Sequence, residues 1–218
     1  MTTQPDKSVG ATLHPRLNDQ GHSVILHKPS QPSSLAAWTD PAALACVIPG
    51  GPMPTEINQI AVKPWKDAPR TAADWEALAA HDAIDEPPFE GSKGLKKAAG
   101  VVVRETDGRV WLVAPSNAFG GYEATFPKGG LETKSTQATA LAEAFEESGL
   151  RVRLIQHLID VRRSTSYTRY YLAERIGGSP ADMGWESQAV LLVPISRLGD
   201  VLNSPVDASI CKKLASIL

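Results

Sequence analysis

Apolar positions divide the chain into a sparse first part and a dense second part. Residues 1–20 are polar and offer little to bury, which predicts a flexible tail. Residues 21–93 contain many prolines, several tryptophans and few long periodic runs. Within this region, short apolar runs at 23–26 and 43–48 predict strands, and 71–80 predicts a helix that begins at a capping threonine.

Residues 94–218 have the alternating and helical periodicities of a folded domain. The apolar runs 98–105 and 109–114 are separated by an Asp-Gly pair, which is a strong signal for a hairpin. The remaining apolar runs predict strands at 124–126, 152–161 and 169–173, a loop followed by a strand over 183–193, and closing helices at 194–202 and 207–218.

One helix in this second part carries an acidic face. The hydroxyls at 135–136 suit an N-cap, and Gly149 accepts the left-handed backbone that follows a last helical turn. At roughly 100° per residue, Glu143, Glu146 and Glu147 fall within an arc of about 100°. The opposite side of the helix is apolar, so one face can pack while the other carries three carboxylates.

These three carboxylates destabilise the helix unless something neutralises them. Like charges at this spacing cost roughly 0.2–0.5 kcal/mol per pair, and the helix dipole disfavours anions at the C-terminal end. The stretch 136–150 contains no Lys or Arg. A divalent cation would remove the repulsion, because Mg²⁺ and Mn²⁺ prefer carboxylate oxygens. From these residues alone, a solvated acidic face without metal is the alternative interpretation.

The residues before the helix favour the metal site. The run 126–132 reads Phe-Pro-Lys-Gly-Gly-Leu-Glu and leads into the helix, which ends Glu-x-x-Glu-Glu-x-Gly-Leu at 143–150. This combination of a glycine loop, a helix and three spaced glutamates resembles the Nudix box, the signature of the Nudix hydrolases. The similarity runs from about Lys96 to the C-terminus. It implies an α/β fold of the α+β type, a mixed sheet in an α/β/α sandwich, here with a Pro- and Trp-rich N-terminal extension.

The resemblance also implies which residues carry the chemistry. Nudix hydrolases cleave nucleoside diphosphates linked to another moiety and use divalent metal, so Glu143, Glu146 and Glu147 become candidate catalytic residues and ligands of Mg²⁺ (or Mn²⁺). The family often adds a backbone carbonyl of the glycine loop as a metal ligand, and Gly129 is the candidate here. A further acidic residue commonly serves as ligand or general base, for which Glu186 is the candidate.

The box departs from the family pattern in its support for the carboxylates. The family usually has Arg directly before the first glutamate, where this chain has Ala142. It also has a glutamate in the loop, where counting from Gly129 gives Ser135, and the loop is one residue shorter. These departures favour an alternative hypothesis, a catalytically weak Nudix-like nucleotide sensor or interaction module. The intact glutamates favour an enzyme.

Five residues are candidate contacts for a phosphorylated small-molecule substrate. Lys128 lies in the glycine-flanked loop, where it can reach a phosphate or pair with the helix glutamates. Phe126 opens the same run. Arg162, Arg169 and Tyr170 cluster around a polar turn between two predicted strands, and Arg can bind phosphate with two parallel hydrogen bonds. Ordinary surface charge is the alternative for the cationic residues.

Composition and charge exclude several other classes of protein. The chain has 218 residues and a net charge of −2, which gives no sign of a general nucleic-acid-binding surface. No apolar run reaches the roughly 18 residues that a membrane span needs, and the N-terminus lacks the apolar segment of a signal peptide. Cys46 and Cys211 have no metal-ligand spacing, which predicts reduced thiols in a cytoplasmic protein.

These observations lead to one main hypothesis. The chain is expected to be a Nudix-type pyrophosphohydrolase acting on ADP-ribose, a sugar nucleotide, a dinucleoside polyphosphate or a related molecule. It divides into a tail at 1–20, an accessory region at 21–93 and a hydrolase domain at 94–218. The accessory region is left open as a cap over the site, a homodimer surface or a partner-binding surface. Its tryptophans are expected in packing, with base stacking by Trp38 or Trp65 as the alternative.

Overall fold

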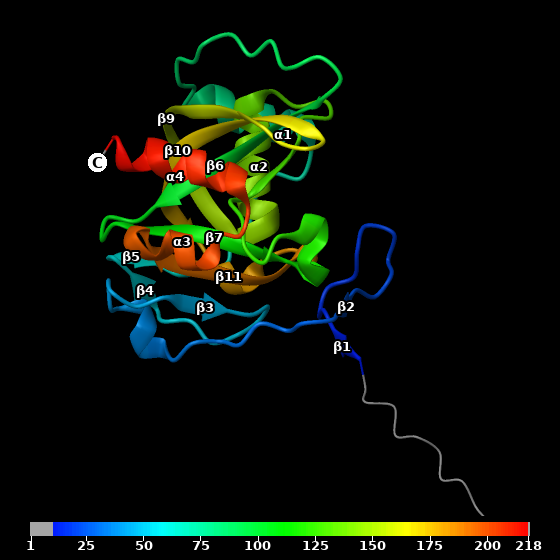
Figure 1. Ribbon diagram of the computed structural model, residues 1–218. Helices are drawn as coiled ribbons and strands as arrows, with labels where there is room; N and C mark the ends of the chain where they lie inside the picture. The colour runs from blue at the N-terminus through cyan, green and yellow to red at the C-terminus, as the bar shows by residue number, and fades with distance from the viewer. Residues whose placement is uncertain (1–10, 218) are drawn as a thin grey trace, which may run out of the picture.

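The computed structural model describes residues 11–217, except for the side chains of residues 119 and 120. A seven-stranded sheet forms the centre of the molecule (Figure 1). Its strands are β3 (Ala45–Val47), β6 (Lys96–Arg104), β7 (Arg109–Pro115), β8 (Lys128–Gly130), β9 (Leu150–Arg162), β10 (Ser166–Gly178) and β11 (Ser187–Pro194). The strand order is β3-β11-β7-β6-β10-β9, and β8 pairs with β6 beside this path. The β6–β10 pair is parallel and the other pairs are antiparallel, so the predicted mixed sheet is confirmed.

Helices cover both faces of this sheet and enclose two separate apolar cores (Figure 1). The predicted α/β/α sandwich is therefore confirmed. Successive residues of β6 alternate between the cores, because Val101 and Val103 enter the first core and Val102 enters the second. None of the described helices is long and apolar enough to cross a membrane. The first core is covered by α1 (Ala72–His81) and α2 (Thr136–Ser148), and the second by α3 (Leu198–Val201) and α4 (Pro205–Ala215).

The box helix α2 begins and ends where local signals predicted. The Ser135 side chain accepts a hydrogen bond from the Ala138 N–H at 3.2 Å, which satisfies one free donor of the first turn. Gly149 has a φ of 68°, the left-handed conformation that ends a helix. On the apolar side, the Phe145 ring lies edge-on to Trp65, with centroids 5.3 Å apart. Aromatic packing therefore fixes α2 from the side opposite its glutamates.

The strand that leads into the box lies later than predicted. Residues 124–126 do not form it, because Thr125 makes only an isolated bridge with Val113. Instead β8 contains both glycines of the loop, and Gly129 pairs with Ala99 of β6. Gly100 allows this close approach, since a Cβ there would collide with the Pro127 carbonyl. The glycine run is therefore a paired strand, and the prediction of a strand at 124–126 was wrong.

The first part of the chain packs against the same sheet. Its strand β3 is the edge partner of β11, and the short strands β1 (Thr12–Leu13) and β2 (Ile25–Leu26) form a hairpin. His14 follows β1 and is buried, with its Nε2 3.0 Å from the Ser187 carbonyl oxygen. Part of the tail predicted at 1–20 is therefore placed against the domain, while residues 1–10 lie outside the described residues. The domain boundaries themselves stay predictions.

A buried ion pair joins this first part to the sheet. The Arg175 Nε donates to Glu105 at 2.5 Å, and both side chains are only 1% exposed. The same guanidinium donates to the Ile57 carbonyl at 2.7 Å, in β4 (Glu56–Ile57), which pairs with β5 (Ile60–Ala61). Trp111 Nε1 also donates to Glu105, at 2.8 Å. Buried charges need such partners, because an unpaired one loses its hydration without compensation.

Removal of one member of this pair should strongly destabilise the fold. Arg175→Met leaves the Glu105 carboxylate buried without its cation, and we expect a loss of about 3–5 kcal/mol in the free energy of unfolding. Arg153→Met is the control, because Arg153 pairs with Glu174 at the exposed surface and should cost less than about 1 kcal/mol. Urea unfolding measures both. Equal losses in the two variants would contradict the assignment.

Candidate active site

The three box glutamates occupy different environments at the C-terminal half of α2. The Glu147 carboxylate is buried and accepts the backbone N–H of Lys128 at 2.9 Å. The Glu143 carboxylate is partly buried and packs directly against Gly129, where a Cβ would collide with it. Glu146 is exposed to solvent. The helix therefore presents two carboxylates to the glycine strand and one to the open edge of the site.

The two positions that depart from the family box have structural roles. Ala142 is completely buried in the first core, so its side chain packs and does not orient the carboxylates. Ser135 is the N-cap of α2, and its hydroxyl is used by the Ala138 N–H. In place of that Arg, the Lys128 N–H binds the Glu147 carboxylate. Burial raises the pKa of Glu143 and Glu146, and the Lys134 charge partly opposes this rise.

Glu186 is brought to the same site by the loop before β11. The Gly184 N–H donates to the Glu146 carbonyl at 2.8 Å, and Gly184 approaches so closely that a Cβ would collide with this oxygen. The Ser116 N–H donates to the Glu186 carbonyl at 2.7 Å. Burial is the main cause of the raised pKa of Glu143 and Glu147, and the Glu186 charge adds to it. The loop before β11 thus brings Glu186 to the end of α2 that carries the three box glutamates.

Burial and mutual repulsion raise the pKa of every carboxyl group in this cluster. Burial, followed by the charges of Glu147 and Glu146, raises the pKa of Glu143 to about 9. Burial raises the pKa of Glu147 to about 7, although the Lys128 cation and its N–H oppose the shift. Burial also raises the pKa of Glu186, with the Asp19 charge as the next cause. The ionised carboxylates are therefore unfavourable unless a positive charge binds beside them.

This donor set fits a hard divalent cation. Carboxylate oxygens are the ligands that Mg²⁺ and Mn²⁺ prefer, and the missing side chain of Gly129 leaves its backbone open beside Glu143. Among the side chains of residues 11–217 that the structure describes, no three acidic, imidazole or thiol groups already form a metal cage.

Lys128 lies between the acidic side chains and a group of aromatic rings that begins with Tyr122. Its Nζ is 5.1 Å from the centre of the Tyr122 ring, a distance at which a cation is attracted to the ring face. Phe126 and Tyr170 are fully buried beneath this layer, with their rings edge-on at 6.2 Å. The Tyr170 hydroxyl accepts a hydrogen bond from Arg163 at 2.8 Å. Phe126 and Tyr170 therefore support the site from below and do not reach solvent.

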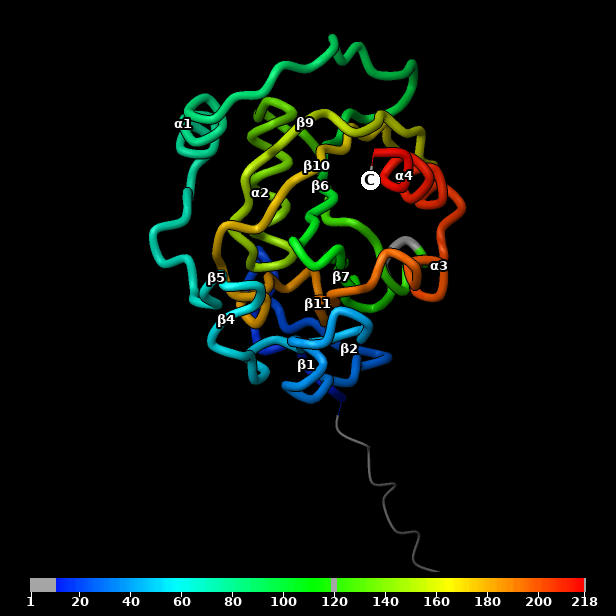
Figure 2. Tube along the Cα trace, turned by 90° about the vertical axis from the view of Figure 1, so that its left-hand side faces the viewer, coloured from blue at the N-terminus to red at the C-terminus, as the bar shows by residue number. Residues whose placement is uncertain are grey.

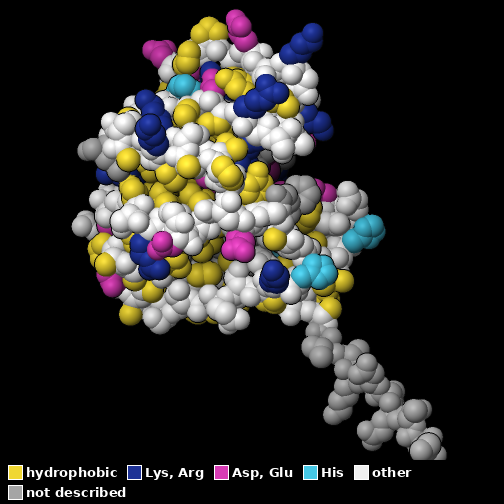
Figure 3. Space-filling view, in the orientation of Figure 1, with side chains coloured by type: hydrophobic (Ala, Val, Ile, Leu, Met, Phe, Trp, Pro, Cys, Tyr) yellow, Lys and Arg dark blue, Asp and Glu magenta, His cyan; other side chains and the backbone are white. Residues whose placement is uncertain are grey.

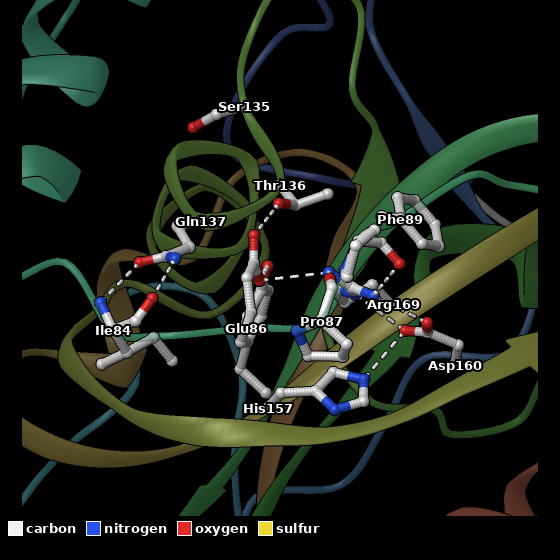
Figure 4. Close-up of polar contacts among 12 residues, drawn as sticks. Ile84, Glu86, Pro87, Phe89, Ser135, Thr136, Gln137, His157, Asp160 and Arg169 are labelled. Atoms are coloured by element: carbon white, nitrogen blue, oxygen red, sulfur yellow. Dashed lines mark hydrogen bonds and ion pairs between the residues drawn. The ribbon is translucent and has the colours of Figure 1, made fainter.

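Arg169 binds the segment between α1 and β6 to the sheet (Figure 4). The segment between α1 and β6 passes over one end of the sheet (Figure 2), and the guanidinium of Arg169 donates to its Pro87 carbonyl at 2.8 Å. The same group forms an ion pair with Asp160 at 2.8 Å and with Glu86 at 3.3 Å. Arg169 is completely buried by these contacts. Its position does not favour the predicted contact with substrate, whereas Arg162 is exposed at the end of β9.

Two further residues join the site without a signal in the sequence pattern. Asp19 lies in the turn between β1 and β2, and its carboxylate accepts the Trp185 indole N–H at 3.0 Å. Its charge raises the pKa of Glu146 and Glu186. Tyr122 precedes the box and carries no periodic signal of its own. Only the long-range folding of the first part of the chain brings Asp19 near the glutamates.

Comparison with known proteins finds one protein family and several similar solved structures. The family model described as the NUDIX domain matches residues 94–207, and no curated protein matches the chain. Similar solved structures include an Ap4A hydrolase from C. elegans, with 16% identity, 56% of this chain and 97% of that chain covered, and a TM-score of 0.46. An ADP-ribose pyrophosphatase from Streptococcus suis has 18% identity, coverage of 56% and 91%, and a TM-score of 0.45. A NUDIX hydrolase from Nitrosomonas europaea has 12% identity, coverage of 56% and 89%, and a TM-score of 0.47.

Together these observations define the class of protein. The sandwich fold and a box helix with its three glutamates are those of a Nudix hydrolase, and the family model covers more than half of the chain. The chain therefore belongs to the Nudix family and is a pyrophosphohydrolase of the Nudix type, as predicted.

The contact between Gly129 and Glu143 generates a test of the metal site. Gly129→Ala places a methyl group where the Glu143 carboxylate lies, so this carboxylate must move. We expect the affinity for Mn²⁺ to fall by about 10- to 100-fold, the range seen when groups that orient metal ligands are altered. Gly130→Ala is the matched control, because nothing lies within 4 Å of a Cβ there. Calorimetric titration measures both, and equal affinities would contradict the geometry.

The raised pKa values predict how pH affects the metal-free protein. Glutamates in the unfolded chain have a pKa of about 4.3, below the values of about 7 and about 9 for Glu147 and Glu143. Between the unfolded pKa and the raised pKa values, the folded state therefore binds more protons than the unfolded state does. The free energy of unfolding should fall as the pH rises from about 5 to about 9. Urea unfolding in EDTA measures this loss. Glu143→Gln should remove the part above about pH 7, and an unchanged pH dependence in this variant would contradict the assignment.

Proposed function

We propose that this protein hydrolyses a diphosphate bond in a nucleoside-diphosphate-linked or related small molecule, with the help of a divalent cation. The observation that carries the proposal is the contact of two box carboxylates with the glycine strand: the Glu143 carboxylate packs against Gly129, and the Glu147 carboxylate accepts the Lys128 N–H. The residues that would hold Mg²⁺ or Mn²⁺ are Glu143, Glu146 and Glu147, with the backbone carbonyl of Gly129 as a further ligand. Glu186 is the fourth acid at this site.

The chemistry divides between the cation and the side chains around it. When bound, the cation supplies positive charge to the phosphoryl oxygens and lowers the pKa of a water molecule. Glu186 is suited to accept the proton of the attacking water, because its side chain reaches solvent and its pKa is raised. The Lys128 ammonium group lies beside the acids and can neutralise a substrate phosphate. Arg162 is a second cation that is open to solvent.

Positioning accounts for most of the remaining catalysis, as in other phosphoryl transfers. Glu147 is fixed by the Lys128 N–H, and Glu186 is fixed through the loop that Gly184 joins to α2. The hydrogen bond between β8 and α2 therefore places the Glu147 carboxylate beside the backbone of Lys128. A substrate phosphate beside the Lys128 ammonium group would meet a positive charge there.

Release of phosphorylated products from a panel of diphosphates tests the proposal. The panel contains ADP-ribose, a sugar nucleotide, a dinucleoside polyphosphate and an inositol pyrophosphate, each with Mg²⁺ or Mn²⁺. We expect turnover of at least one compound, and its loss in EDTA. Glu147→Gln should lower kcat by at least about 100-fold, because a metal site contributes several kcal/mol of charge stabilisation. The control Glu174→Gln changes a partly exposed glutamate of β10 and should leave kcat unchanged.

The same panel separates the enzyme from the alternative hypothesis. No turnover of any compound, combined with a higher melting temperature in the presence of one of them, would contradict hydrolysis. That result would support a nucleotide sensor, because a ligand that binds only the folded state raises its stability.

A further inference from the structure

The loop that carries Glu186 is held by the N-terminal hairpin of β1 and β2. This Glu186 loop, residues 183–186, joins the 3-10 helix η3 (Pro180–Asp182) to β11. In Figure 1 the hairpin lies at the right-hand side of the molecule, and the space-filling view shows a notch above it on that side (Figure 3). The hairpin precedes residues 94–207, so it is not part of the matched family domain.

Ser116, the residue after β7, binds the backbone of the Glu186 loop twice. Its N–H donates to the Glu186 carbonyl at 2.7 Å, and its hydroxyl donates to the Trp185 carbonyl at 2.7 Å. The Ser187 N–H turns back to the Gly184 carbonyl at 3.2 Å. Three successive carbonyls, from Gly184 to Glu186, therefore receive their donors from residues of the family domain.

The next carbonyl, that of Ser187, receives its donor from the hairpin. Strand β3 pairs with β11 at residues 190–192 and does not extend to Ser187 at the start of β11. The Ser187 carbonyl oxygen lies 3.0 Å from Nε2 of His14, and because a carbonyl can only accept, this nitrogen carries the proton and donates. Both residues are buried, and a buried carbonyl that loses its donor is unfavourable. His14 thus takes the place that a longer β3 would occupy.

The imidazole ring of His14 is itself fixed by the hairpin. The His14 N–H donates to the Val24 carbonyl at 2.8 Å, and the Arg16 N–H donates to the ring Nδ1 at 3.0 Å. The turn that closes the hairpin is built on Asn18, whose side-chain oxygen accepts two backbone N–H groups of this turn at 3.1 and 2.8 Å. These contacts hold the ring in one orientation toward β11.

A second contact joins the turn of the hairpin to the Glu186 loop. The Asp19 carboxylate accepts the indole N–H of Trp185 at 3.0 Å, and Trp185 directly precedes Glu186. His14 binds Ser187, the residue that directly follows Glu186. The hairpin therefore binds both neighbours of Glu186.

Holding both neighbours fixes the point from which the Glu186 side chain extends. A displacement of about 1 Å in a reacting group can lower a rate by about 100-fold. Glu186 is exposed at the site, so packing of its own side chain contributes little to its position. The backbone contacts of its neighbours are consequently its main support.

We propose that the hairpin of β1 and β2 positions Glu186 for catalysis, and that His14 is a positioning residue that acts through the Ser187 carbonyl. The inference rests on the proposed function, in which Glu186 accepts the proton of the attacking water. A segment outside the family domain would then complete the active site of this chain.

A kinetic test combines variants of His14 with Glu186→Gln, on a diphosphate that the wild type hydrolyses. His14→Leu removes the donor, and we expect kcat to fall about tenfold or more while KM changes less than about twofold. His14→Gln should restore most of kcat, because its amide nitrogen can donate to the same carbonyl. In the Glu186→Gln background, His14→Leu should cause no further fall.

The last comparison separates positioning from a general loss of structure. An equal fall of kcat with and without the Glu186 carboxylate would overturn the inference, and so would a fall that His14→Gln does not restore. His22→Leu is the matched control, because His22 is an exposed histidine of the same hairpin. We expect this variant to keep the kcat of the wild type.

Hydrogen exchange tests the same contact without any substrate. In His14→Leu, the amides of Gly184 and Ser187 should exchange about fivefold or more faster than in the wild type, which is the scale of one lost hydrogen bond. The amides of β6 should exchange at the wild-type rate. NMR measures both, and unchanged exchange at Gly184 and Ser187 would overturn the inference.

Failure of this inference differs from failure of the proposed function. If the wild type hydrolyses no diphosphate, the proposed function is contradicted, and the exchange rates alone decide whether His14 holds the Glu186 loop. If the wild type is active and His14→Leu keeps its kcat, hydrolysis stands and the positioning role of the hairpin is overturned.

Discussion

The hydrogen bond from the Lys128 N–H to the buried Glu147 carboxylate is the constraint on which the rest of the site depends. A carboxylate that is removed from water must find donors within the protein, or the folded state loses its solvation energy. Here the donor is backbone, so β8 cannot shift along β6 without leaving Glu147 unpaired. The glycines of this region serve the same constraint, because a side chain at Gly100 would collide with the Pro127 carbonyl and one at Gly129 would displace the Glu143 carboxylate. The helix and the strand therefore act as one rigid unit.

This constraint also explains how the site is maintained without the family's usual Arg. A long cation at position 142 would have to leave a position that is completely buried against the sheet. The chain instead has a backbone donor for the Glu147 carboxylate, and the charge of Lys134, just before the N-cap of α2, partly opposes the repulsion at Glu143. Neither removes the repulsion, since the pKa of Glu143 remains raised. The metal-free state is consequently strained by its own charges.

The parts of this structure that local sequence determines were predictable, and those that depend on distant contacts were not. Ser135 and Gly149 fix the ends of α2 through their own backbone and side-chain chemistry, and both ends were predicted correctly. The strand β8 was misplaced because two glycines give no strand signal, and only pairing with β6 makes them one. Arg169 was assigned to substrate because a strand pattern gives the face of a side chain but not its partners. Glu86 and Asp160 are those partners.

Asp19 shows the same limit for the site. It is an ordinary polar residue in sequence, and only the packing of the hairpin formed by β1 and β2 brings its carboxylate to the Trp185 indole N–H. The Nudix box identified the class of chemistry because its residues lie close together along the chain.

The parallel pair of β6 and β10 has a consequence for the order in which the molecule is assembled. The whole box, with β8 and α2, lies in the connection between these two strands, and the pairing joins residues that are far apart in sequence. Contacts of this kind form late, because the entropy of closing a long loop is lost before they contribute. During synthesis the acids of α2 leave the ribosome before β10 and well before Glu186. The four acids therefore come together only after the chain as far as Glu186 has been made.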